Sequence, residues 1–321
     1  MSDFDFKIYE DVEQLPIETG LDNELCQIMY TDEYKQVMGI ARKMMQDKEY
    51  SERALTLTSK VIDLVSAFYT IWNYRFSIVE SLLENSYSND KQAFVNKEMD
   101  WLDDITLNNP KNYQIWSYRQ ALLNIHPNPD MKRELPILQI MIDEDTKNYH
   151  VWSYRKLCVQ FFQDYTNELQ YTDSLIQRDV YNNSAWTHRM FVLKYVQADT
   201  EMVRYEIDYT KEKIEFVPQN VSSWNYLRGL YEIFLEYKYD EEIIEFAKTF
   251  TNNILDIDTC REETVSQFPP IESSFALEFL ADVYSQDSTK CTNAIKALSA
   301  LALKYDPIRK GLWNYKINKL T

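Results

Sequence analysis

The chain has 321 residues, with 51 Asp or Glu against 34 Lys or Arg, so its formal net charge is −17. Nucleic-acid binding normally needs a basic face, and this balance therefore excludes nucleic acid as an expected partner. Only 4 Gly and 9 Pro interrupt the chain, which favours an all-α fold. The acidic N-terminus lacks an apolar signal region and no stretch has the length of a membrane span, so we expect a cytoplasmic protein.

The cysteines and histidines predict no metal centre within this chain. Only 3 His occur. The four cysteines, Cys26, Cys158, Cys260 and Cys291, are separated by 132, 102 and 31 residues. This spacing lacks the paired ligands of a zinc site. The motifs HExxH, GxxxxGK[ST], GxGxxG and GxSxG are also absent from the sequence. If the chain takes part in catalysis, a metal or nucleophile must therefore come from another polypeptide.

A Trp-x-x-Arg pattern recurs along the chain. Four copies are intact and two are degenerate: Trp72/Arg75, Trp116/Arg119, Trp152/Arg155, Trp186/Arg189, Trp224 with Arg228 one position late, and Trp313 with Lys316 in place of Arg. The Trp positions step by 44, 36, 34 and 38 residues and then by 89. A period near 35 is typical of helical hairpins stacked in a solenoid. We therefore expect each Trp to lie between neighbouring hairpins.

The first repeat, SAFYTIWNYR, departs from the later ones in two ways. Phe68 stands where the later repeats have Asn, so we expect no side-chain cap at the start of this helix. The step of 44 residues to the next Trp predicts a longer connection around Asn85–Lys91.

An Asn four residues before Trp predicts a helix start in the next four repeats, at Asn112, Asn148, Asn182 and Asn220. Its side-chain oxygen can accept an N–H group of the first helical turn. Pro110 and Pro218 lie just upstream, where a preceding helix must end. The Arg one turn after each Trp lies on the same face, and we expect it to bond to carbonyls or carboxylates of the adjacent hairpin.

The helices between the Trp-bearing ones are predicted from their apolar periodicity, over Met131–Asp143, Asn167–Arg178 and Glu201–Glu215. The polar segment Asp256–Ser274 is the clearest break in the pattern. It explains the interval of 89 residues if the hairpin within that interval has lost its Trp. Helices are expected to resume over Phe275–Tyr284 and Cys291–Tyr305.

Three consecutive repeats resemble those of protein farnesyltransferase and geranylgeranyltransferase type I α subunits. They read PKNYQIWSYRQALL over 110–123, TKNYHVWSYRKLCV over 146–159 and NNSAWTHRMFVL over 182–193. Further matching stretches, from YTDEYKQVM at 30–38 to YDPIRKGLWNYK at 305–316, extend the resemblance over nearly the whole chain. One Trp-x-x-Arg alone would be weak evidence, whereas six ordered copies with these flanks are specific.

The resemblance implies an all-α, right-handed superhelical solenoid of antiparallel helical hairpins, crescent-shaped, in a single domain over 1–321. An extended N-terminal arm would cover 1–25, and the repeats would cover about 50–321. The implied function is that of the α subunit of a CaaX protein prenyltransferase, a transferase active only as a heterodimer with a β subunit. No cofactor is expected in this chain; the β subunit would hold zinc and the isoprenoid diphosphate. The acceptors would be CaaX-tailed proteins such as small GTPases.

The duplicated triplet Lys-Asn-Tyr, at 111–113 and 147–149, is the sharpest candidate for chemistry. Both copies precede a helix, so they should project from one edge of the solenoid about one repeat apart. Departure of a diphosphate builds negative charge on its oxygens, and an ammonium group with phenolic hydroxyls is a suitable set of fixed donors. The resemblance makes Lys111 the diphosphate-contacting lysine and Tyr149 a donor to the leaving phosphate, with Tyr113 and Asn148 nearby. The alternative is that the lysines are solvated, Asn caps a helix and Tyr packs.

The resemblance also implies a peptide-binding set. Gln114 matches a residue that bonds the C-terminal carboxylate of the CaaX peptide, and His150 matches a peptide contact. Ala67 and Tyr69 align with residues near the peptide exit. The alternative is an exposed helix glutamine and a structural histidine.

Two other functions remain open at this point. The α subunit of the Rab-type geranylgeranyltransferase has the same repeats, although Gln114 and His150 suit a CaaX site. A non-catalytic tetratricopeptide-like scaffold would make the two Lys-Asn-Tyr triplets accidental. The sequence does not decide between farnesyl and geranylgeranyl transfer, because the resemblance implies that one α chain can serve two β subunits. It also does not decide whether Mg²⁺ is needed with farnesyl diphosphate.

Overall fold

The computed structural model describes residues 4–17, 25–26, 28–257 and 262–321. Within these ranges the chain forms α-helices, short 3₁₀ segments, one π-helical stretch and turns, and no strand. The predicted all-α fold is therefore confirmed. Cys260 and part of the predicted N-terminal arm, residues 1–3 and 18–24, lie outside the described ranges. The chain divides into two compact units, Met1–Gln163 and Asp164–Thr321.

The helices of the first unit are α1 (Asp32–Asp47), α2 (Glu52–Leu64), α3 (Tyr69–Asn85), α4 (Lys91–Asn108), α5 (Tyr113–Ile125), α6 (Met131–Glu144) and α7 (Tyr149–Phe162), after a 3₁₀ turn at Phe6–Tyr9. Those of the second unit are α8 (Glu168–Arg178), α9 (Asn183–Tyr195), α10 (Thr200–Phe216), α11 (Val221–Phe234), α12 (Glu241–Thr249), α13 (Ser274–Ser285), α14 (Cys291–Ala300) and α15 (Lys310–Leu320). The 3₁₀ segments of this unit are Ile254–Asp256, Glu262–Gln267, Ser288–Lys290 and Pro307–Arg309, and a π-helical stretch, Leu301–Tyr305, follows α14.

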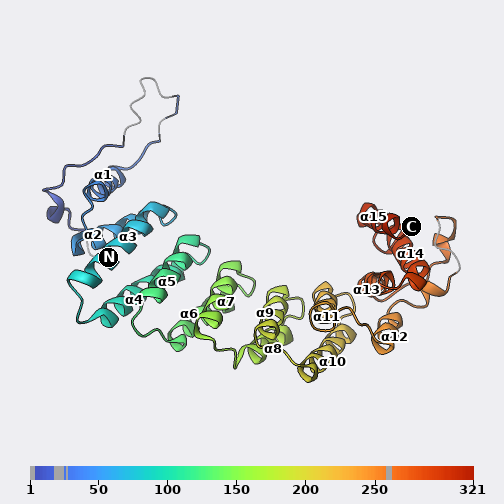
Figure 1. Ribbon diagram of the computed structural model, residues 1–321. Helices are drawn as coiled ribbons and strands as arrows, with labels where there is room; N and C mark the ends of the chain where they lie inside the picture. The colour runs from blue at the N-terminus through green and yellow to red at the C-terminus, as the bar shows by residue number, and fades with distance from the viewer. Residues whose placement is uncertain (1–3, 18–24, 27, 258–261) are drawn as a thin grey trace. The chain divides into compact units, whose positions relative to one another are not determined.

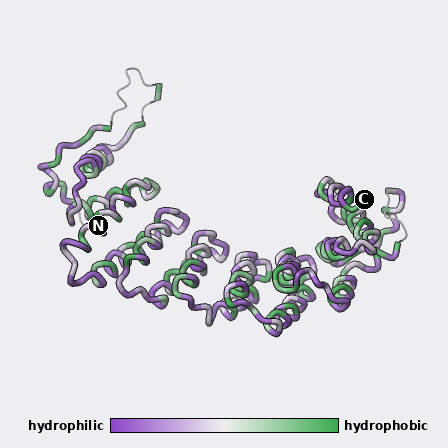
Figure 2. The backbone as a smooth tube through the Cα atoms, viewed as in Figure 1, coloured by the Kyte–Doolittle hydropathy of each residue, from purple (hydrophilic) through white to green (hydrophobic). Residues whose placement is uncertain are grey.

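Consecutive helices pair into hairpins in both units (Figure 1). In the first unit α2 packs on α3, α4 on α5 and α6 on α7, and the second helices α3, α5 and α7 contact one another in turn. In the second unit α8 pairs with α9, α10 with α11, α12 with α13 and α14 with α15. Figure 2 shows hydrophobic and hydrophilic residues alternating along the helices, the pattern expected where one helical face is buried.

Each of the first five hairpins turns over four residues, at 65–68, 109–112, 145–148, 179–182 and 217–220. The predicted helix ends upstream of Pro110 and Pro218 are confirmed, because α4 ends at Asn108 and α10 at Phe216. The four predicted Asn caps are also confirmed, since each side-chain oxygen accepts the N–H group two residues further on at 2.8–3.1 Å. Phe68 makes no such cap bond, as expected.

The prediction of a longer connection around Asn85–Lys91 is wrong. Only residues 86–90 join α3 to α4, and five residues also join α5 to α6. The step of 44 residues arises because α3 has 17 residues against 13 in α5, and α4 has 18 against 14 in α6. Each helix thus gains about one turn, which keeps its apolar face in phase with the next hairpin.

A backbone carbonyl links two hairpins in three of the turns, at Ser66, Pro110 and Val180. The indole N–H of Trp72 donates to the Ser66 carbonyl at 2.8 Å, and the amide of Asn112, from the next hairpin, donates to the same oxygen at 2.8 Å. Val180 repeats the arrangement, with Trp186 at 2.8 Å and Asn220 at 2.7 Å. A carbonyl oxygen has two lone pairs and can serve both donors. The Asn therefore caps its own helix and also joins it to the preceding turn.

Buried glutamates form a second link between hairpins. Glu206 on α10 accepts two bonds from Arg189 of the preceding hairpin, at 2.6 and 2.7 Å, and one from the Tyr226 hydroxyl at 2.6 Å. Glu98 repeats this with Arg75 and Tyr118. Burial and the neighbouring carboxylate raise the pKa of the Tyr226 hydroxyl well above its usual range, so it stays a donor. The predicted bonding of Arg to carboxylates of the adjacent hairpin is confirmed for these repeats.

In the degenerate repeats, other residues take the places of the buried Trp and of the Arg that follows it. Leu277 of α13 stands four residues after the capping Ser273, where earlier repeats have Trp, and it is fully buried. The predicted hairpin without its Trp is therefore confirmed as α12 and α13. The two residues that replace the regular Arg both pair with Asp282 of α13. Nε of Arg228 lies 3.1 Å from its Oδ2, and Nζ of Lys316 lies 2.9 Å from its Oδ1.

Asn220→Ala is expected to lower the free energy of unfolding by about 2 kcal/mol, because it removes a helix cap and a buried amide bond to Val180. Asn220→Ser keeps a capping oxygen and loses only the bond to Val180, so about 1 kcal/mol is expected. Urea titration of the full chain measures both values. A serine variant as unstable as the alanine variant would show that the cap contributes nothing here.

Candidate functional site

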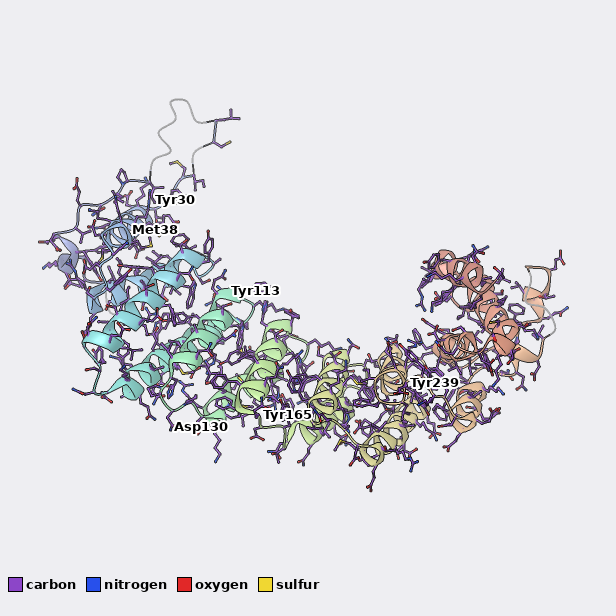
Figure 3. All side chains as sticks on the ribbon, viewed as in Figure 1. Tyr30, Met38, Tyr113, Asp130, Tyr165 and Tyr239 are labelled. Carbon is purple, nitrogen blue, oxygen red and sulfur yellow. The ribbon has the colours of Figure 1, made fainter. Side chains whose placement is uncertain are left out.

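The turns 65–68, 109–112 and 145–148, with the first two residues of α3, α5 and α7, form one edge of the first unit, which we name the lip. It carries every predicted site residue: Ala67, Tyr69, Lys111, Tyr113, Gln114, Asn148, Tyr149 and His150. Figure 3 labels Tyr113 at this edge, and Asp130 at the opposite edge of the unit. The prediction that both Lys-Asn-Tyr triplets project from one edge is confirmed.

Lys111 extends from the second turn of the lip toward the third. Its ammonium nitrogen lies 3.3 Å from Oδ2 of Asp145, and 73% of its side chain is exposed. Lys147 holds the equivalent place in the third turn, and its backbone N–H donates to Oδ1 of Asp145 at 3.1 Å. The Lys111 ammonium therefore pairs with the next turn of the lip while most of its side chain stays accessible to a ligand.

Three aromatic rings gather where α5 and α7 begin. The ring of His150 contacts Tyr113 edge-on, with centroids 4.2 Å apart, and lies 5.7 Å from Tyr149. The tyrosine side chains are 64% and 70% exposed. Burial lowers the pKa of His150 below its usual value, so its imidazole is neutral at pH 7. The cluster thus presents two exposed phenolic hydroxyls beside a neutral imidazole.

Asn148 caps α7 and also joins two turns of the lip. Its side-chain oxygen accepts the N–H of His150 at 3.0 Å, and its amide donates to the Pro110 carbonyl at 3.3 Å. The side chain is buried. Asn148 therefore sets the spacing between the turn that carries Lys111 and the helix that carries Tyr149.

The remaining predicted residues lie on the same edge. Gln114 is half-buried in the first turn of α5, and its N–H donates to the capping Asn112. Ala67, in the first turn of the lip, and Tyr69, at the start of α3, are exposed. The bond from Asn112 to Ser66 places this turn next to the second one. The three turns therefore form a continuous row.

Neither the role of Asp145 in the lip nor that of the buried glutamates between the hairpins was predicted from the sequence. Asp145 belongs to the acidic run 143–145, which in sequence is typical of a solvated helix end. A positional signal exists, because an Asn or Asp stands three residues before the capping Asn in three turns, at Asn109, Asp145 and Asp179. For the glutamates the signal is a fixed separation of 20 residues from the Tyr or His that each one bonds.

No three His, Cys, Asp or Glu side chains converge as metal ligands among the residues that the structure describes. None of the helices over these residues is both long and apolar enough to cross a membrane. The lip carries the ammonium groups of Lys111 and Lys147, the carboxylate of Asp145, phenolic hydroxyls, amides and an imidazole. Such a set suits recognition of a phosphorylated anion and of a peptide.

The model of the protein prenyltransferase alpha subunit repeat matches five segments of the chain, at 51–82, 95–126, 131–162, 165–196 and 203–234. Each segment covers one hairpin, from α2 and α3 to α10 and α11. The repeat units predicted from the Trp pattern therefore coincide with the family model up to residue 234.

Similarity to individual proteins extends over the full length. A protein farnesyltransferase/geranylgeranyltransferase type-1 subunit alpha of Candida albicans is 40% identical over 98% of this chain and 97% of its own. Its counterpart in Dictyostelium discoideum is 30% identical over 98% and 92%. The solved structure of Candida albicans protein geranylgeranyltransferase-I complexed with GGPP covers all of both chains with a TM-score of 0.82 and 38% identity. A geranylgeranyl transferase type-2 subunit alpha of Rattus norvegicus is 29% identical over only 40% of this chain and 23% of its own.

Proposed function

This chain belongs to the family of protein prenyltransferase α subunits, and from that membership we propose that it forms a heterodimer with a β subunit and helps to transfer an isoprenoid to the cysteine of a CaaX tail. The full-length similarity to subunits shared by farnesyltransferase and geranylgeranyltransferase type I supports this choice over the Rab-type enzyme. We assign the complex to the cytoplasm and the whole chain, 1–321, to a single functional domain.

One observation carries the proposal: Lys111, Tyr113 and Tyr149 present exposed donors along one edge of the first unit. In the transfer, the cysteine sulfur forms a bond to C1 of the isoprenoid while the bond from C1 to the diphosphate oxygen breaks. The electron pair of that bond goes to the diphosphate. Donors that are fixed before the reaction stabilise this growing charge without reorganising.

We assign the roles on the lip accordingly. Lys111 donates to the departing diphosphate as a charged donor, and Tyr149 and Tyr113 donate as phenols. Asn148 keeps the two turns at the right spacing, as its bonds to Pro110 and His150 indicate.

The peptide side of the site uses the other half of the lip. The Gln114 amide can donate to the terminal carboxylate of the peptide. His150 is neutral at pH 7 and can donate or accept one bond to the peptide backbone. Ala67 in the first turn and Tyr69 at the start of α3 line the path by which the peptide leaves.

We assign zinc to the β subunit, where it would activate the thiol when bound. Mg²⁺ with farnesyl diphosphate likewise belongs to the complex and not to this chain. The residues that we assign to this chain bind and orient the diphosphate and the peptide tail. All of them belong to the lip.

Reconstitution tests the proposal directly. The chain is co-expressed with each candidate β subunit, and the purified heterodimer is offered farnesyl or geranylgeranyl diphosphate. The acceptors are a CaaX-tailed protein, the same protein with its CaaX cysteine replaced by serine, and a Rab protein. We expect transfer to the CaaX protein alone. Transfer to the Rab protein only, or no heterodimer with any β subunit, would overturn the proposal.

A further inference from the structure

Asp145 connects the third turn of the lip to Lys111. Its Oδ1 accepts the backbone N–H of Lys147 at 3.1 Å, while its Oδ2 lies 3.3 Å from the ammonium nitrogen of Lys111. The backbone of Asp145 is also held, because its N–H donates to Met141 at 3.1 Å and its carbonyl accepts the N–H of Asn148 at 3.0 Å. The Asp145 carboxylate is therefore held in place by its turn, whereas the Lys111 side chain that it faces is long and largely exposed.

The equivalent residue of the second turn is Asn109, which offers an amide and no charge. The turn geometry does not itself demand a carboxylate at this position. The charge of Asp145 acts instead on Lys111, which comes from another hairpin and has most of its side chain in solvent. A free lysine side chain samples many rotamers, and an anchored anion restricts them.

The Lys111 ammonium is held beside the turn that precedes Tyr149, another residue to which we assign contact with the diphosphate. Asp145 precedes Tyr149 by four residues across one short turn, so the restrained ammonium lies on the same turn that positions the phenol. An ammonium group has three N–H donors. It can keep one bond to Asp145 and still donate to the oxygens of a phosphate.

We propose that Asp145 is a positioning residue that holds the Lys111 ammonium at the third turn, so that Lys111 and Tyr149 are both in place when the diphosphate departs. The inference rests on the function proposed above and adds a residue to it. Asp145 touches neither reacting group and acts through Lys111 alone.

Asp145→Asn separates this role from a structural one, because the amide oxygen of Asn can still accept the N–H of Lys147, as a turn of this type requires. In the reconstituted heterodimer we expect the single-turnover rate to fall about two- to fivefold, the ratio that corresponds to an exposed ion pair. The dissociation constant for the isoprenoid diphosphate should not rise, since the variant removes a negative charge beside a polyanion. A merely structural defect would weaken binding and heterodimer assembly as well.

Asp130→Asn is the matched control. Asp130 caps α6 through Oδ1, which accepts the N–H of Lys132 at 2.9 Å, and Figure 3 places it at the opposite edge of the unit. The control removes the same charge and keeps the same kind of bond, so wild-type rates are expected.

The double variant Lys111→Ala with Asp145→Asn completes the test. We expect it to be as slow as Lys111→Ala alone, because without the ammonium group Asp145 has nothing to position. A wild-type rate for Asp145→Asn, or an equal loss from this change with and without Lys111, would overturn the inference alone. A wild-type heterodimer that transfers no isoprenoid would overturn the proposed function and this inference together.

Discussion

Lys111→Ala is expected to slow isoprenoid transfer by about 10²–10³-fold in a single turnover, the usual effect of losing one fixed donor to a developing oxyanion. The side chain is 73% exposed and its one ion pair, with Asp145, lies at the surface. Truncating it should therefore leave folding and heterodimer assembly unchanged. Rapid quenching after mixing enzyme-bound isoprenoid diphosphate with a CaaX peptide measures the rate of the chemical step.

The matched control for this prediction is Lys132→Ala. Lys132 is an exposed lysine in the first turn of α6, at the edge opposite the lip. It carries the same charge in the same unit and should not alter the rate. An unchanged single-turnover rate for Lys111→Ala would remove Lys111 from the catalytic set.

Glu206→Ala is expected to lower the free energy of unfolding by about 3–5 kcal/mol, because it leaves a buried guanidinium without its anion. Glu206 is fully buried and accepts two bonds from Arg189 and one from Tyr226. The variant also leaves the Tyr226 hydroxyl buried without this acceptor. Urea titration of the full chain, followed by far-ultraviolet circular dichroism, measures the loss.

Glu212→Ala provides the control on the same helix. Glu212 is exposed, and its removal should change the stability by no more than about 0.5 kcal/mol. Glu206→Gln keeps an acceptor for Tyr226 but not the charge that Arg189 needs, so it should be nearly as unstable as the alanine variant. A stable Glu206→Gln variant would mean that hydrogen bonding, and not charge, joins these hairpins.

The features that were predicted from the sequence are those that act within a few residues of one another. An Asn four positions before Trp caps its own helix, so the pattern is readable without knowledge of the fold. The lip followed from the same logic, because identical triplets at the start of equivalent helices in neighbouring repeats should project from one edge. The roles of Lys111 and Tyr149 in chemistry remain predictions.

The features that were missed depend on which segments lie side by side. An acid on an amphipathic helix looks the same whether it faces water or a buried arginine, so Glu98 and Glu206 gave no signal on their own helices. Only the neighbouring hairpin supplies their partners. The pairing of Lys111 with Asp145 likewise crosses 34 residues of sequence. The extra residues between Trp72 and Trp116 were wrongly assigned to a longer connection between helices. Their number alone does not distinguish a longer loop from one added turn in each of two helices.

The constant length of the turns has a practical consequence for engineering this protein. Every turn between the two helices of the first five hairpins has four residues, whereas α4 has 18 residues and α8 has 11. Differences in length between the repeats are thus taken up by the helices, and the spacing of the three turns of the lip does not depend on them. The exposed residues Pro127 and Asn128, in the connection 126–130 at the opposite edge of the first unit, are accordingly the place to insert an affinity tag or a fluorescent reporter.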